Sequence, residues 1–177
     1  AEAAWLATTR LRNEPGAGFG ALRKSDAQRT QPSLPPTLLH TDQFDVRIAN
    51  DRLLPEAEQL IKARYAERGY ATEGIQLSAR DQSRLTLAAT DKNADVIGTM
   101  SLRMDTPEHR LAADKTFAAE LQSLRSHDNK LIEYGRFAIH SDAPAELAKN
   151  MMWVAVSASK LNHATHGVIE VNPRHVA

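Results

Sequence analysis

A glutamate and an arginine stand three residues apart in an otherwise apolar stretch, residues 131–139 (LIEYGRFAI). Burying either charge in a sheet is costly unless the charge is paired or used. On a regular strand Glu133 and Arg136 face opposite sides, because their separation is odd. Gly135 between them is typical of a β-bulge, which inserts one residue and brings both side chains to one face. The bulge also turns a backbone N–H toward the crevice, where it can bind a developing oxyanion. The stretch indicates either a structural ion pair or a catalytic carboxylate beside a cation.

The pattern of apolar residues predicts the elements that position this stretch. Alternation, or a short apolar run, predicts strands at 44–48, 85–90, 96–103, 131–139 and 168–172. Helical spacing predicts a helix from Pro55 to Gly69, a second helix after Pro107 and a long helix over 143–163. Residues 91–95 are rich in turn formers, which favours a hairpin between the strands on either side. The order β-α-β-β-α-β-α-β predicts an α/β (α+β) domain with a central mixed sheet flanked by helices, in which the last two strands run parallel.

The first 43 residues differ from the rest. They hold four of the eight prolines and three of the eight glycines, and their apolar residues have no sustained period beyond a short helical possibility at residues 5–11. This composition predicts an N-terminal arm over residues 1–43 and a folded domain over residues 44–177. The arm is expected to pack on the domain or on a neighbouring subunit, which would make a homo-oligomer.

Composition excludes several classes of function. Lysine plus arginine equals aspartate plus glutamate, so the excess positive charge of a duplex-binding protein is missing and no nucleic-acid partner is expected. Without cysteine, the chain has no thiolate nucleophile or cysteine zinc site. No apolar run could cross a membrane and no secretory signal is visible, so the expected compartment is the cytoplasm. His163, His166 and His175 with Glu170 fit a structural or solvent-facing role better than that of metal ligands, so no metal is expected.

The motif Glu133-x-x-Arg136-Phe137-Ala138 resembles the E-x-x-R-[FL]-A strand of acyl-homoserine-lactone autoinducer synthases and of their relatives, the N-acyl amino acid synthases. These families share the GNAT-like acyltransferase fold. Other similar segments follow in the family's order over about residues 44–177: Arg64-Tyr65 with Gly69-Tyr70, Asp81, Gly98–Arg103, Phe117–Arg125 and Val171-Asn172-Pro173-Arg174-His175. The last of these resembles the V-N-P-[RK]-H element of the N-acyl amino acid synthase branch.

The resemblance implies an N-acyltransferase that moves a fatty acyl group from a carrier-protein or CoA thioester to the amine of an amino acid or small amine. Glu133 is then the candidate base, directly or through a water molecule, and a backbone N–H near Phe137 or Ala138 stabilises the oxyanion. Arg103 and Arg136 bind a substrate carboxylate or hold Glu133. The acyl tail enters between strands 131–139 and 168–172. The expected substrate-binding residues are Arg64, Tyr65, Asp81, Phe137, Ala138, Ile139 and Asn172.

The donor follows from the loop after the central strand, residues 140–144 (HSDAP), which contains an acid and a proline but no glycine. Such a loop makes a poor cradle for the pyrophosphate of CoA. Acyl-phosphopantetheine on an acyl carrier protein is therefore the expected donor, with no tightly bound cofactor.

Two other functions stay open. A homoserine-lactone-type synthase would use S-adenosylmethionine as acceptor, but the aromatic and acidic residues typical of that branch are reduced here to Tyr65, Tyr70 and Asp81. A catalytically silent GNAT-like binding module is the second, because the family pattern continues beyond the point where this chain ends, at Ala177. A last strand at 168–172 would leave the N–H and C=O groups of one sheet edge unpaired. We therefore expect this edge to be covered by further strands absent from the given sequence or by another chain, with the proline-rich arm a poorer candidate.

Overall fold

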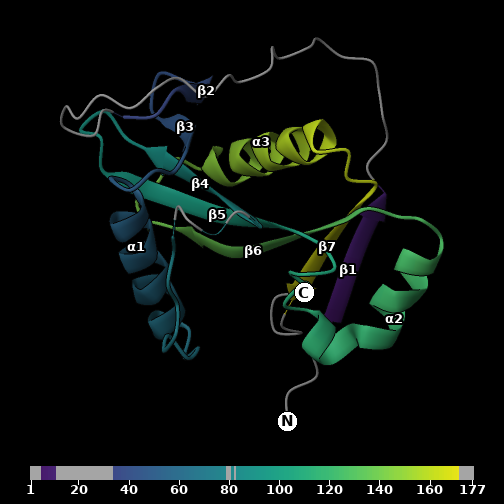
Figure 1. Cartoon of the computed structure of the whole chain (residues 1–177). Coiled ribbons are helices and arrows are strands. Elements are labelled where there is room, and N and C mark those ends of the chain that lie inside the picture. The colour runs from purple at the N-terminus through teal and green to yellow at the C-terminus, as the bar shows by residue number, and fades with distance from the viewer. Residues whose placement is uncertain (1–4, 11–33, 79–80, 82, 172–177) are drawn as a thin grey trace.

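A seven-stranded sheet forms the body of the protein in the computed structural model, which describes residues 5–10, 34–78, 81 and 83–171 (Figure 1). The strand order is β1-β7-β6-β5-β4-β3-β2. The strands are β1 (Trp5–Arg10), β2 (Thr37–His40), β3 (Asp45–Ile48), β4 (Arg84–Thr90), β5 (Val96–Met104), β6 (Leu131–Ile139) and β7 (His166–Val171). The helices are α1 (Leu54–Glu67), α2 (Asp114–Ser126) and α3 (Leu147–Leu161).

The predicted order of elements from residue 44 onward is confirmed, with bounds that differ by a few residues. β4 and β5 form the expected antiparallel hairpin, and β6 lies between β5 and β7 in the sheet. β6 and β7 run parallel, paired from Leu131 opposite His166 to Tyr134 opposite Ile169. The sheet is therefore mixed, and the stretch that carries Glu133 and Arg136 is one of its inner strands.

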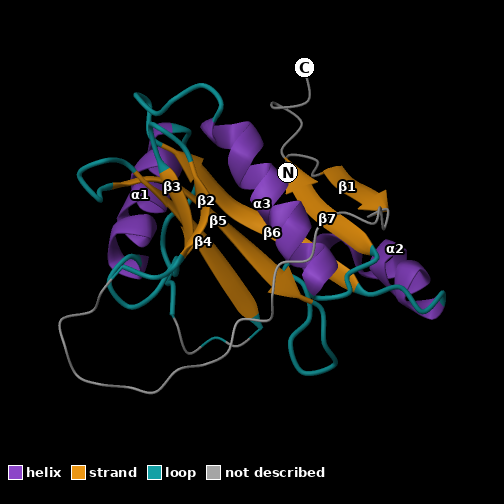
Figure 2. Cartoon of the chain, turned by 90° about the horizontal axis from the view of Figure 1, so that it is seen from above, coloured by secondary structure: helices purple, strands orange, loops and turns teal. Residues whose placement is uncertain are grey.

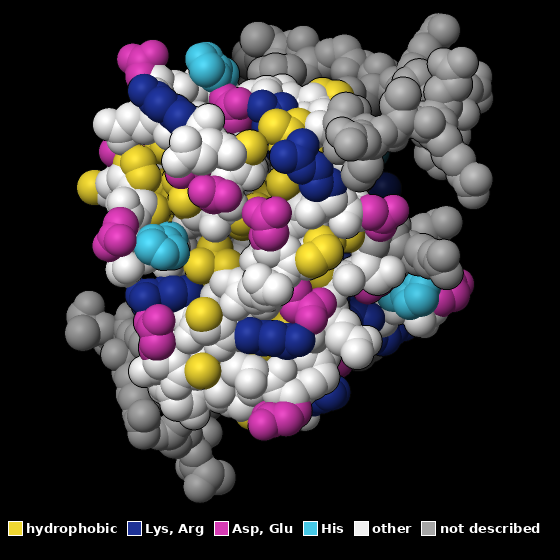
Figure 3. All heavy atoms as spheres, turned by 90° about the vertical axis from the view of Figure 1, so that its left-hand side faces the viewer, with side chains coloured by type: hydrophobic (Ala, Val, Ile, Leu, Met, Phe, Trp, Pro, Cys, Tyr) yellow, Lys and Arg dark blue, Asp and Glu magenta, His cyan; other side chains and the backbone are white. Residues whose placement is uncertain are grey.

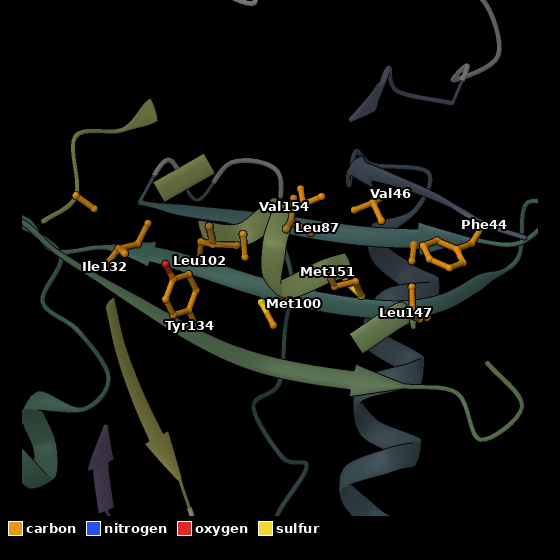
Figure 4. Close-up of a cluster of buried hydrophobic side chains, with 13 residues drawn as sticks. Phe44, Val46, Leu87, Met100, Leu102, Ile132, Tyr134, Leu147, Met151 and Val154 are labelled. Carbon is orange, nitrogen blue, oxygen red and sulfur yellow. The ribbon is translucent and has the colours of Figure 1, made fainter. Parts of the chain in front are cut away.

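Helices α1 and α3 cover opposite faces of the sheet (Figure 1). The main apolar core lies on the α3 side, where Met151 and Leu147 pack over the inner strands (Figure 4). Gly98 of β5 permits this close approach, because a Cβ atom there would lie 2.8 Å from the sulfur of Met151. Tyr134 also faces α3, and its hydroxyl forms a 2.8 Å hydrogen bond with that of Ser159.

Helices α1 and α2 lie toward opposite ends of the sheet (Figures 1 and 2). Leu121 of α2 packs against Leu131 of β6 and Val168 of β7. Leu131 and Glu133 alternate with Ile132 and Tyr134, which belong to the core on the α3 side, so α2 covers the same face as α1. The face between the two helices is where Glu133 is located.

The N-terminal segment corrects two expectations. Residues 5–10 form strand β1 and not the suggested helix, and β1 pairs antiparallel with β7 from Trp5 opposite Val171 to Arg10 opposite His166 (Figure 1). The edge of β7 is covered, as expected, but by the arm of the same chain. The alternation of β1 is too short and too weak to indicate a strand without its partner. A second strand from before residue 44, β2, extends the opposite edge beside β3.

Acidic and basic side chains are interspersed over the face of the molecule that Figure 3 shows, in agreement with the zero net charge of the chain. Within the described residues, no helix is long and apolar enough to span a membrane.

Candidate active site

The predicted β-bulge is present in β6. Thr99 of β5 lies opposite Ala138 and Ser101 lies opposite Gly135, so Arg136 and Phe137 together face the single residue between them on β5. The residue in the left-handed conformation is Arg136, with φ of 50°, and not Gly135. This backbone is uncommon for a residue with a side chain and is found where the surroundings hold it in place.

The bulge reverses which side chains face α1. Before it, Leu131 and Glu133 face the side of α1 and α2. After it, Ala138 packs with Leu60 and Ile61 of α1, whereas Ile139 packs against the core beneath α3. Without the inserted residue, Ala138 would face α3. The bulge thereby places Arg136 on the wall of the same cavity as Glu133.

Glu133 is nearly buried, with 7% of its surface exposed, and is held by the segment that leads into α2. Its Oε2 accepts a 2.7 Å hydrogen bond from the backbone N–H of Ala112, and its Oε1 accepts a 3.0 Å hydrogen bond from the N–H of Ala113. Because these N–H groups precede the first turn of α2, the carboxylate also lies at the positive end of that helix. Both oxygens are oriented before any ligand binds.

Burial raises the pKa of Glu133 above its ordinary value of 4.5. The backbone N–H groups of Ala112 and Ala113 and the positive charge of Arg103 act in the opposite direction, and the negative charge of Glu170 adds to the increase. A carboxylate with a raised pKa that keeps its hydrogen-bond donors is a stronger base than an exposed one.

Arg125 of α2 fixes the segment that holds Glu133. Its Nε and one terminal nitrogen bind both carboxylate oxygens of Asp105, at 2.6 and 2.9 Å. The same guanidinium binds both oxygens of Asp114, each at 2.7 Å. Asp105 follows β5 and Asp114 begins α2, so one arginine ties together the two ends of the 105–114 segment. The sequence pattern gives no sign of this clamp.

Two arginines and Glu133 form a row across three strands. Arg84 of β4 lies opposite Arg103 of β5, and Arg103 lies opposite Glu133 of β6. The Nε atom of Arg103 is buried and has no hydrogen-bond partner among the described residues. Burial lowers the pKa of Arg84, and the charge of Arg103 lowers it further, although Asp81 and Glu133 oppose the change. The row therefore holds positive charge that the protein only partly compensates.

A cavity of about 520 Å³ opens over this row. Across the sheet, the charged lining residues run from Glu170 of β7 and Glu133 of β6 to Arg103 of β5 and Arg84 of β4, with Arg136 in the bulge of β6. Arg110, in the segment before α2, and Lys115, in its first turn, add two more cations, and the lining also includes Tyr65, Ser101, Leu111, Ala112, Tyr134 and Gly135. No Glu133–Arg136 ion pair occurs among the described residues, although both side chains line the cavity.

The structure brings four of the predicted site residues to this cavity: Glu133, Arg136, Arg103 and Tyr65. Arg64 instead pairs with Glu67 on the surface of α1. Asp81 lies just outside, accepting hydrogen bonds from the backbone and the hydroxyl of Ser83 and approaching Arg84 at 3.9 Å. The roles predicted for these residues stay predictions.

The other predicted substrate-binding residues do not line the cavity. Ala138 lies beneath α1 and Ile139 packs toward α3, while Phe137 is 37% exposed within the bulge. Asn172 lies outside the described residues.

Sequence reasoning missed Arg84, Glu170 and the residues that lead into α2. Arg84 could have been found from the predicted hairpin, because the register of two paired strands fixes which residues are opposite each other. The residues of the 110–115 segment have no such signal, because they reach Glu133 only through the tertiary fold. Within the described part of the chain, no cluster of three or more histidine and acidic side chains could hold a metal ion.

The loop after β6 offers few free backbone donors. The N–H of Asp142 bonds to the Nδ1 of His140, and the N–H of Ala143 bonds to the carbonyl of His140. The Asp142 carboxylate is 86% exposed beside these groups. Among the described residues, β6 pairs with β7 only as far as Tyr134, which lies opposite Ile169.

Comparisons with known proteins bear on the family and the fold. The family model described as N-acyl amino acid synthase FeeM matches residues 56–177, more than half of the chain. The structure of FeeM, an N-acyl amino acid synthase from uncultured soil microbes, is similar with a TM-score of 0.65 and 21% identity, over 75% of this chain and 74% of that one. A comparison with curated protein sequences finds no significant match.

Two acetyltransferases are similar at lower identity. A ribosomal-protein-alanine N-acetyltransferase from Brucella melitensis biovar Abortus 2308 has a TM-score of 0.53 and 11% identity, over 73% of this chain and 81% of that one. A GCN5-related N-acetyltransferase from Ralstonia eutropha JMP134 has a TM-score of 0.50 and 11% identity, over 74% and 85%. The predicted GNAT-like fold is therefore confirmed.

Proposed function

The chain belongs to the N-acyl amino acid synthase FeeM family and is thus an acyltransferase, and on this premise we propose that it transfers a fatty acyl group from an acyl carrier protein thioester to the amine of an amino acid. The observation that carries the proposal is the order of charges across the sheet at the cavity, from Glu170 of β7 and Glu133 of β6 to Arg103 of β5 and Arg84 of β4. A zwitterionic amino acid has the matching arrangement, with its ammonium toward Glu133 and Glu170 and its carboxylate toward Arg103 and Arg136.

In the proposed reaction Glu133 accepts a proton from the ammonium, either directly or through one water molecule. The freed amine lone pair then attacks the thioester carbonyl carbon, and a tetrahedral oxyanion forms. When this intermediate collapses, the C–S bond breaks and the new C–N bond remains. The attacking nitrogen loses its second proton to the departing carrier thiolate, which leaves an amide and a thiol, and Glu133 returns the first proton to solvent. A raised pKa helps Glu133 in the first step, because a stronger base removes the proton more readily.

The β6–β7 pairing of the described residues ends at Tyr134, which supports entry of the acyl chain between these strands. The donor preference rests on the loop of residues 140–144. Its N–H groups at positions 142 and 143 are already bonded within the loop, and Asp142 would repel a pyrophosphate. Phosphopantetheine on a carrier protein has no pyrophosphate, so it needs no such N–H groups.

The test is to incubate the purified protein with an amino-acid mixture and either acyl carrier protein or CoA loaded with the same acyl chain, and to identify products by mass spectrometry. We expect N-acyl amino acids and a higher kcat/KM with the carrier protein. Transfer to S-adenosylmethionine in place of amino acids would identify a homoserine-lactone-type synthase. Absence of any acyl product would leave the binding-module alternative, and a preference for CoA would overturn the donor assignment.

The matched variant is Glu133→Gln, which removes the base and should lower kcat by about 10²–10⁴-fold. The two backbone hydrogen bonds complicate it, because the new amide must point its NH₂ at one of the N–H groups of Ala112 and Ala113. An unsatisfied buried group costs about 1–3 kcal/mol, so Tm is measured first and rates are compared well below it. Unchanged turnover in a folded variant would refute Glu133 as the base.

A further inference from the structure

Arg84 is a third guanidinium at the cavity, beside Arg103 and Arg136. Two guanidiniums are enough to bind the single carboxylate of an ordinary amino acid. Arg84 is directly opposite Arg103, and like charges that face each other across two strands destabilise a sheet. Arg136 reaches the same cavity from the bulge. Burial lowers the pKa of Arg136, and the neighbouring charges of Arg84 and Arg103 lower it further, against the opposing effects of Tyr65 and Asp81. The three cations are therefore close enough to repel one another.

In the described part of the chain, no carboxylate lies within hydrogen-bond distance of these three groups, and the charges of Glu58, Asp81 and Glu133 act on them only from farther away. Arg84 approaches Asp81 only at 3.9 Å, and Asp81 already accepts two hydrogen bonds from Ser83. Arg136 donates a 2.6 Å hydrogen bond to the carbonyl of Gln76, a neutral acceptor. Within the described part of the chain, Arg103 has no ion pair with a carboxylate, and its buried Nε has no acceptor at all.

The donor count exceeds what an ordinary amino acid can accept. Each guanidinium presents five N–H groups, whereas one carboxylate offers about four acceptor positions. The α-carboxylate of a bound amino acid therefore satisfies part of the cluster and neutralises one of its three charges. The other two cations at the cavity are Arg110, in the segment before α2, and Lys115, in the first turn of α2. Arg110 already lies 3.7 Å from Asp105.

We propose that the amino acid acceptor carries a second anionic group, a side-chain carboxylate or phosphate, and that Arg84 with Arg103 and Arg136 selects for it. The inference rests on the proposed function, since it names the class of acceptor for the same site. Glu133 and Glu170 hold the ammonium end, and the side-chain anion extends toward β4. Arg84 is the specificity-determining residue, because it is the member of the cluster farthest from Glu133 along the row.

The experiment compares isosteric acceptors at a fixed concentration of the acyl donor that supports turnover. Glutamate is compared with glutamine, and phosphoserine with serine, so that each pair differs by the side-chain anion. We expect kcat/KM to favour the acidic member of at least one pair by about 10-fold or more, as for a charge-assisted hydrogen bond in a partly buried site. The pair with the larger ratio distinguishes carboxylate from phosphate.

Arg84→Gln should reduce this ratio toward one. The control is Arg52→Gln, an exposed arginine in the turn before α1, which should leave the ratio unchanged. Equal or better turnover of glutamine and serine in the unmodified protein would overturn the inference and leave the proposed function standing.

If no acceptor is acylated, that result counts against the proposed function. A binding measurement then tests the anion selectivity without relying on activity. Glutarate, a dianion, and butyrate, a monoanion, are compared at equal ionic strength for their effect on Tm. Glutarate should raise Tm more than butyrate in the unmodified protein and lose this advantage in Arg84→Gln. Equal increases in Tm with glutarate and butyrate would overturn the proposed selectivity for a second anionic group.

Discussion

At the scale of single residues, Glu133 combines two requirements that usually conflict. Its carboxylate is nearly buried, which disfavours the charged form, yet both oxygens accept backbone N–H groups, which favours it. A fully exposed carboxylate would be too weak a base, and a buried one without donors would stay protonated. The net result of these opposing effects is a pKa of Glu133 above its ordinary value.

A substitution of Glu170 tests these opposing effects on the pKa of Glu133. Its negative charge raises the pKa of Glu133, so Glu170→Gln should lower that pKa. If Glu133 is the base, kcat/KM falls as the pH falls through its pKa, because only the carboxylate accepts a proton. This acidic limb should lie above pH 4.5 in the unmodified protein and move to lower pH in Glu170→Gln. The measurement is kcat/KM against pH with one acceptor.

Because Glu170 is exposed, its substitution should not disturb the fold, and Tm serves as the check. The control is Glu73→Gln, which replaces an exposed glutamate in the loop after α1, away from the cavity lining. An acidic limb that stays in place in Glu170→Gln would mean that some group other than Glu133 controls the rate in this pH range.

At the scale of elements, the sequence predicted the strands and helices after residue 44 because each has a clear apolar period. It also predicted the bulge, since a glycine between two charges in an apolar strand favours a break in the alternation. It could not predict that Ala112 and Ala113 would hold Glu133, because alanine side chains say nothing about where their backbone N–H groups point. Strand β1 was missed for a related reason: its pairing with β7 is a contact between segments far apart in the sequence.

The Arg125 clamp is the element-scale feature with the largest expected effect on stability. The Asp105 side chain is 6% exposed, so Arg125→Gln leaves a buried carboxylate without its close partner. Breaking such a pair costs about 3–5 kcal/mol of unfolding free energy. Arg110→Gln is the control, since Arg110 approaches the same carboxylate at 3.7 Å but is half exposed and should contribute less than about 1 kcal/mol. Denaturant unfolding of the three proteins measures the difference.

The unfolding free energy that Arg125→Gln removes should become smaller at acidic pH. Hydrogen bonds from Arg125 hold the pKa of Asp114 below its ordinary value of 3.8. The stabilisation is therefore complete above that value and is lost as the pH falls through the lower pKa of the folded state. The gap in Tm between Arg125→Gln and the unmodified protein should narrow as the pH is lowered from about 6 to about 3. A Tm difference that stays constant or grows as the pH falls would contradict a stabilising interaction between Arg125 and Asp114.

At the scale of the whole molecule, the two ends of the described chain meet at the side of the sheet that carries Glu133 and Glu170. β7 holds Glu170 and packs Val168 against α2, and β1 forms its outer neighbour (Figure 1). All residues that line the cavity come from beyond residue 64, so the N-terminal strand supports the site only through its pairing with β7. The far edge of the sheet, formed by β2, has no part in the cavity lining.

Removal of residues 1–10 tests this arrangement. The loss of β1 exposes the backbone N–H and C=O groups of β7 along six paired positions, and an open edge of this kind pairs readily with another chain. We expect a lower Tm, a shift toward higher-mass species in light scattering after size-exclusion chromatography, and a lower kcat/KM because β7 no longer holds Glu170 in place. The control replaces residues 37–40 of β2 with glycine and serine, which weakens the other edge and should lower Tm while changing kcat/KM less. A truncated protein that keeps the original Tm, mass and kcat/KM would show that β7 needs no partner from the N-terminal segment.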